Sequence, residues 1–132
     1  MRPQIEARER RLEENRKKAA IAFDRMMGKV QIFLADGNTH SAYKTVTYFA
    51  GQYEQNLSPE LLVTAASEAV RIGIKAKTNI QELGKWLHKG VATAMSSQAR
   101  EGIEESLDLI DAYGEYFYQK TLAKGLCCLG IY

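Results

Sequence analysis

Apolar residues recur at spacings of three and four along most of the chain, which is the period of an amphipathic α-helix. No stretch alternates strictly between apolar and polar residues, so the pattern predicts no strand. Proline, which interrupts helices, occurs only at positions 3 and 59. The pattern therefore predicts an all-α fold.

The first predicted helix is long. It begins near Pro3 and continues to about Leu34, where the segment "ADGN" supplies Gly37 as a C-terminal stop. A second helix starts after Asn38 or Thr39. Its apolar residues keep the helical spacing and are Ala42, Val46, Phe49, Tyr53 and Leu57.

Three further helices are expected. In "LSPEL", Ser58 can cap a helix and Pro59 takes its first position, which predicts a third helix over residues 59–76. Thr78 and Gln81 have capping-box spacing and predict the start of the fourth. The last runs from about Gln98 to Leu122. The small residues of the third helix allow neighbours to approach closely, so it should be the central one: Ala65, Ala66, Ala69 and Gly73.

These elements predict two parts of the chain. Residues 1–36 would form a long basic N-terminal helical arm, and residues 37–132 a compact bundle of about four helices. At 132 residues the chain is long enough to bury a core of its own.

On a helical wheel the first helix has three sides. One side, about 100° wide, is apolar. A basic line lies on one flank within about 40° and consists of Arg11, Lys18, Arg25 and Lys29. The opposite flank is acidic and consists of Glu6, Glu9, Glu13 and Asp24. A solvated helix gains most by mixing charges at i,i+4, so this separation favours an external anionic partner.

Charge is also graded along the chain. Residues 1–29 carry nine Lys and Arg and five Asp and Glu, whereas residues 96–132 carry three and six. The gradient suggests an anionic partner at one end or chains that meet head to tail.

In the last predicted helix the acidic side holds Glu101, Glu104, Glu105, Asp108, Asp111 and Glu115. The other side is apolar and holds Ile103, Leu107, Ile110 and Phe117.

The partner that best fits the basic line is double-stranded DNA, because neutralising phosphates releases counterions whatever the base sequence. The line is roughly 27 Å long at 1.5 Å per residue. The candidate nucleic-acid-binding residues are Arg8, Arg10, Arg11, Arg16, Lys17, Lys18, Arg25 and Lys29. The apolar side would meet like subunits through Ile5, Leu12, Phe23, Met26, Val30 and Phe33.

Two alternatives remain open. Residues 66–90 have a residue spacing similar to that of a helix-turn-helix motif, although Asn79 occupies a position at which that motif buries an apolar residue. A small DNA-binding regulator would use the secondary basic patch, which consists of Lys75, Lys77, Lys85 and Lys89. A protein-interaction adaptor would instead use the first helix in a coiled coil.

The sequence offers no catalytic or metal-binding motif. His40 and His88 are isolated in the sequence, and neither has a nucleophile or orienting partner that can be identified. We therefore expect no enzyme activity, cofactor, metal or small-molecule substrate. The charged N-terminus does not resemble a signal peptide, and no apolar run is long enough to span a membrane. The adjacent Cys127 and Cys128 cannot join distant segments, which fits a reducing, cytoplasmic setting.

In outline the chain resembles the major capsid proteins of rod-shaped and filamentous archaeal viruses. The resemblance rests on the arm "RERRLEENRKKAAIAFDRMMGK" and the bundle after Gly37. It implies that the arm wraps double-stranded DNA in the A form and that the bundles pack as a helical sheath. It further implies a structural, non-enzymatic protein that polymerises in a virion.

Overall fold

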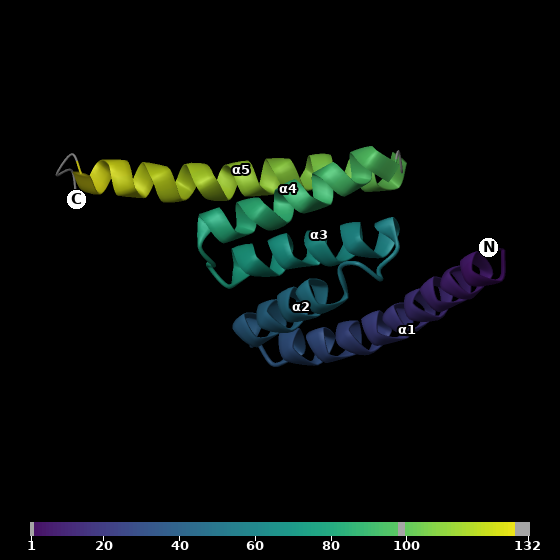
Figure 1. Ribbon diagram of the computed structural model, residues 1–132. Helices are drawn as coiled ribbons and strands as arrows, with labels where there is room; N and C mark the ends of the chain where they lie inside the picture. Colours follow the sequence, from purple (N-terminus) through teal and green to yellow (C-terminus); the bar gives the residue numbers. More distant parts are fainter. Residues whose placement is uncertain (1, 98–99, 129–132) are drawn as a thin grey trace.

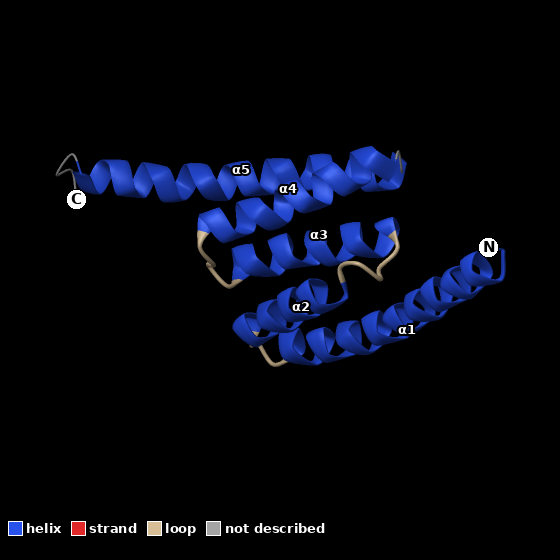
Figure 2. Cartoon of the chain, in the orientation of Figure 1, coloured by secondary structure: helices blue, strands red, loops and turns tan. Residues whose placement is uncertain are grey.

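The computed structural model describes the backbone of residues 2–97 and 100–128 and the side chains of residues 3–96 and 104–120. Within these ranges the chain is helical, without strands, and short loops join the helices (Figure 1, Figure 2). The predicted all-α fold is confirmed. The helices are α1 (Arg2–Ala35), α2 (Thr39–Tyr53), α3 (Pro59–Lys75), α4 (Ile80–Ser97) and α5 (Arg100–Cys128).

The turn between α1 and α2 follows from its local sequence, as predicted. Gly37 has a φ of +75°, a left-handed conformation that glycine adopts without steric cost. Its amide donates to the carbonyl of Leu34 at 3.1 Å, and the amide of Asn38 donates to the carbonyl of Phe33 at 2.8 Å. These two bonds close α1 in the Schellman arrangement. Asn38 then caps α2, because its side-chain oxygen accepts from the amide of Ser41 at 3.2 Å.

The turn between α3 and α4 differs from the prediction. The amide of Thr78 donates to the carbonyl of Gly73 at 2.9 Å, so Thr78 closes α3 and does not open α4. The cap of α4 is Asn79, whose side-chain oxygen accepts from the amides of Gln81 at 2.8 Å and Glu82 at 3.4 Å. Both Asn and Thr cap helices well, so the capping-box spacing alone could not choose between adjacent residues.

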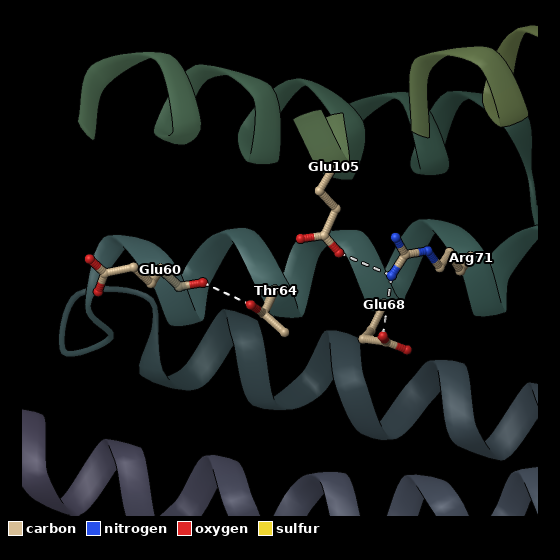
Figure 3. Close-up of polar contacts among 5 residues, drawn as sticks. All are labelled: Glu60, Thr64, Glu68, Arg71 and Glu105. Atoms are coloured by element: carbon tan, nitrogen blue, oxygen red, sulfur yellow. Dashed lines mark hydrogen bonds and ion pairs between the residues drawn. The ribbon is translucent and has the colours of Figure 1, made fainter. Parts of the chain in front are cut away.

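Helix α3 is central, as its small residues predict. Ser58 caps its start, because the Ser58 hydroxyl accepts from the amide of Leu61 at 3.3 Å, and the helix packs on α2, α4 and α5. Arg71 links α3 to α5, because its guanidinium lies 3.0 Å from the carboxylate of Glu105 (Figure 3). The same guanidinium lies 3.5 Å from the carboxylate of Glu68, which is in α3 itself. Helix α1 packs on α2 and α5 packs on α4, so α1 and α5 lie on opposite sides of the molecule (Figure 1).

Burial along α1 changes within the helix. From Pro3 to Lys18 the side chains are exposed, apart from the half-buried Ala7, and this half extends past the end of α2 (Figure 1). From Ala19 onward the apolar side is buried against the core. The change falls between Lys18 and Ala19, so the second half of α1 belongs to the core and its exposed half spans residues 3–18.

Helix α5 buries a different face from the one its sequence favours. The buried side chains of its described part are Ser106, Leu109 and Tyr116, whereas Leu107 and Ile110 are exposed. Tyr116 accounts for this difference. The hydroxyl of Tyr116 donates to the carbonyl of Thr78 at 2.8 Å, in the turn that joins α3 to α4. A tyrosine buries an apolar ring while its hydroxyl keeps a polar partner, so this face packs inward although it carries polar atoms.

Tyr43 provides a test of the contact between α2 and α4. Its hydroxyl donates to the carboxylate of Glu82 at 2.9 Å, and the ring is buried. Burial, together with the bond to Glu82, raises the pKa of the Tyr43 hydroxyl well above its ordinary value. Above about pH 10 the unfolded chain loses this proton while the folded chain keeps it, so the free energy of unfolding falls as the pH rises.

We expect this group to contribute a slope of about 0.7 kcal/mol per pH unit at pH 10, which approaches about 1.4 kcal/mol per pH unit by about pH 11. Urea unfolding of the wild type and of Tyr43→Phe, followed by circular dichroism between about pH 8 and 11, measures it. The variant should lose stability less steeply with pH. Parallel curves for the two proteins would show that Tyr43 keeps its ordinary pKa.

Candidate anion-binding surface of the first helix

The basic line predicted for the first helix lies on one side of α1. Lys18, Arg25 and Lys29 line the same groove between α1 and α2. Arg11 continues the line at the helical period into the exposed half of α1. From Lys18 to Lys29 the line is about 16 Å long at 1.5 Å per residue.

These cations are not neutralised by the chain's own described carboxylates. In the part of the chain whose side chains are described, α1 has one ion pair, between Arg10 and Glu6 at 4.0 Å, and both side chains are exposed. Such a pair contributes little to stability. The predicted acidic flank is also exposed, and none of its four residues lines the groove. The positive side of α1 is therefore available to an external anion.

The groove beside the line has a volume of about 850 Å³. Its cationic rim gains Lys44 from α2, and no carboxylate lines it. Its floor is apolar and aromatic and includes Phe33 and Phe49. Tyr48 stands beside them with 74% of its surface exposed. The groove therefore combines positive charge with uncovered apolar surface.

The six residues predicted to contact other subunits fall into two groups, one on each side of the change in burial between Lys18 and Ala19. Phe23, Met26 and Val30 are buried within the chain and belong to its core. Phe33 is partly buried against that core and borders the groove. Ile5 and Leu12 lie in the exposed half and keep large apolar surfaces in solvent. These two are thus the members of the set with most surface left for another molecule.

The secondary basic patch of α3 and α4 is less uniform. Lys75, Lys77 and Lys85 are exposed. Lys89 is engaged within the chain, because its ammonium lies 2.8 Å from the carboxylate of Glu54 and 5.1 Å from the ring centre of Trp86. Lys77 has a φ of 56°, an uncommon conformation for a residue with a side chain.

Other candidate chemistry remains isolated. His40 borders a smaller hollow of about 320 Å³ beside Tyr43 and Glu82. Among the described side chains, no three His, Cys, Asp or Glu residues are placed to hold a metal ion. No helix of the described part has the length and apolar content to cross a membrane. The side chains of Cys127 and Cys128 lie outside the described residues.

Sequence reasoning did not place Lys44 or the exposed Tyr48 beside the basic line, although these residues complete the groove on the α2 side. Their spacing of four residues, continued by Gln52, indicates a shared face of α2. The spacing does not say which helix that face lies beside.

Comparison of the chain with models of protein families, with curated proteins and with solved structures finds no match.

Proposed function

We propose that this protein is a non-enzymatic structural protein that coats double-stranded DNA without sequence specificity. The observation that carries the proposal is the exposed half of α1. Over residues 3–18 it carries six Lys and Arg, of which Arg10 alone has an ion pair with a described side chain. Arg8, Arg11 and Lys18 lie within about 80° of one another on the helical wheel, away from the acidic flank.

A phosphate backbone is the ligand that this geometry suits. Cations on a straight rod follow a regular line, and a duplex presents charges at regular intervals along its axis. Contacts to phosphates position a protein without reading bases, so the binding would not depend on sequence. Arg16 and Lys17 lie elsewhere around α1 and would add long-range attraction.

The alternative surface on α4 is less suited to DNA. Helix α4 packs on both α3 and α5, which limits how much of it can enter a DNA groove. Lys89, at its centre, is already paired with Glu54. The coiled-coil alternative has also lost part of its basis, since Phe23, Met26 and Val30 face the core of the same chain.

We expect replacement of Arg8, Arg11 and Lys18 by Gln to weaken DNA binding and to flatten its salt dependence. Each phosphate contact contributes about 0.9 to the slope of log K against log salt concentration, so the slope should fall by about 2.7. Fluorescence anisotropy of a labelled duplex, titrated at several salt concentrations, measures this change.

The matched control replaces Lys75, Lys77 and Lys85 by Gln, which removes the same charge from α3, α4 and the turn between them. Its slope should stay close to that of the wild type. An equal loss in the control, or a preference for one duplex sequence, would favour the regulator that uses residues 66–90. Absence of salt-dependent binding in the wild type would instead favour the adaptor.

Coating also requires that neighbouring copies contact one another. The resemblance to archaeal virus capsid proteins makes a helical filament in a virion the expected assembly; a cytoplasmic nucleoprotein is the alternative location. Electron micrographs of the protein with and without duplex DNA test this expectation. Longer or more regular filaments in the sample with DNA would support it, and single particles in both samples would contradict it.

A further inference from the structure

Helix α5 presents an apolar face that nothing in the described chain covers. Leu107, Ile110 and Phe117 are 57%, 42% and 46% exposed. With Gly114 they follow spacings of three, four and three, so they form one stripe along the helix. The stripe adjoins the buried face of Ser106, Leu109 and Tyr116, which leaves α5 apolar on two sides. An exposed stripe of large apolar residues marks an interaction surface.

The stripe is bordered by negative charge. Asp108, Asp111 and Glu115 are exposed and lie along its other edge, on the side away from the buried face. None of the three forms an ion pair with a described side chain of its own chain. A partner for this surface should therefore offer apolar surface edged by positive charge.

The groove between α1 and α2 has that character. Its apolar surface includes the exposed Tyr48 and the partly buried Phe33, and its rim holds Arg25, Lys29 and Lys44. Along α1 it extends from Lys18 to Phe33, about 22 Å, whereas the stripe on α5 is about 15 Å long. The groove is thus long enough to receive the stripe.

We propose that α5 of one copy docks in the α1–α2 groove of a second copy. Helix α5 and the α1–α2 pair lie on opposite sides of the molecule (Figure 1), so each copy can receive one neighbour and dock into another. Such a head-to-tail contact generates an open chain unless its rotation closes a ring. This is the contact between copies that the proposed coating function requires, but it does not itself need DNA.

Two other pairings are less favourable: DNA in the groove, and a second α5 against the stripe. A DNA duplex would satisfy the cationic rim, but its phosphate backbone cannot cover the apolar floor. A second α5 would meet the stripe with apolar side chains and bring a second set of carboxylates to it. Docking of α5 in the groove covers both apolar surfaces and also pairs opposite charges.

Complementary charge reversal tests the proposal in DNA-free solution. One variant carries Asp108→Lys, Asp111→Lys and Glu115→Lys, and the other carries Arg25→Glu, Lys29→Glu and Lys44→Glu. In each, one surface now repels its counterpart, so self-association should weaken by about tenfold or more. An equimolar mixture restores opposite charges at every contact and should associate like the wild type. Sedimentation at low salt measures all four samples.

A third variant, Leu107→Gln with Phe117→Gln, removes the apolar part of the stripe. It should also lose association, and no charge-reversed partner should rescue it. The proposal is overturned if the wild type stays monomeric, if either charge-reversed variant associates as the wild type does, or if the mixture fails to recover.

DNA titrations of the same proteins separate this proposal from the proposed function. Loss of DNA binding in the groove variant, with self-association unchanged, would assign the groove to DNA and overturn the docking. Recovery of association in the mixture would support the docking even if no sample bound DNA.

Discussion

Replacement of Phe49 by Ala is expected to lower the free energy of unfolding by about 3–5 kcal/mol. Phe49 is 6% exposed, and its ring stacks on that of Tyr53 with centroids 4.8 Å apart. It also meets Phe23 of α1 at 6.0 Å. The loss removes buried area and leaves a cavity where α1 joins α2. Because domains of this size are stable by about 5–15 kcal/mol, the change should be obvious in urea unfolding followed by circular dichroism.

Tyr48→Ala is the matched control, since it removes an aromatic side chain from the adjacent position of α2. Tyr48 is exposed, so its loss should change the free energy of unfolding by no more than about 0.5 kcal/mol. Similar midpoints for the two variants would contradict the packing of α1 on α2 through Phe49.

The ends of the first helices were predictable because they depend on residues close together in the chain. Gly37 stops α1 through its own backbone freedom, and Ser58 and Pro59 start α3 through bonds within one turn. The start of α4 shows where this logic ends. Thr78 and Asn79 both suit a cap, and the choice depends on how the end of α3 binds the amide of Thr78.

The groove was not predictable, because it depends on which helices become neighbours. Periodicity places Lys18, Arg25 and Lys29 on one side of α1, but it does not place Lys44 beside them. The apolar period of α1 continues without a break from the exposed Leu12 to the buried residues that begin at Ala19. The pattern therefore could not show at which residue of α1 the packing against α2 ends. Residue spacing identifies the helices and their faces, whereas only the tertiary structure shows which element packs on each face.

In α5 the difficulty is that two adjacent faces are apolar. The charge pattern favours Leu107, Ile110 and Phe117 as the inward side, because they lie away from most of the carboxylates. The structure buries the tyrosine-bearing face, where a backbone carbonyl accepts the hydroxyl of Tyr116. A hydrogen bond between residues 38 positions apart leaves no periodic signal in the sequence.

Replacement of Gly73 by Ala is expected to destabilise the fold by about 1–3 kcal/mol, although Ala favours a helix by about 1 kcal/mol. A Cβ atom at position 73 would overlap the side chain of Leu83 and lie 3.0 Å from Cε2 of Tyr43. Both neighbours are buried, so neither can move aside without disturbing the contact of α3 with α2 and α4. Gly51→Ala is the control of opposite sign, because no described atom outside the neighbouring residues and the helix's own backbone would lie within 4 Å of the added Cβ, and the helix should gain about 0.5–1 kcal/mol.

A double-mutant cycle with Leu83→Ala isolates the cause. Leu83 is fully buried, so its truncation alone should cost about 2–5 kcal/mol. In the double variant the new methyl group at position 73 occupies space that the truncated side chain has left. The combined loss should therefore be smaller than the sum of the two single losses by about 1–3 kcal/mol. Additive losses in urea unfolding would mean that Gly73 and Leu83 do not compete for the same space, and the close approach of α3 and α4 would then need another explanation.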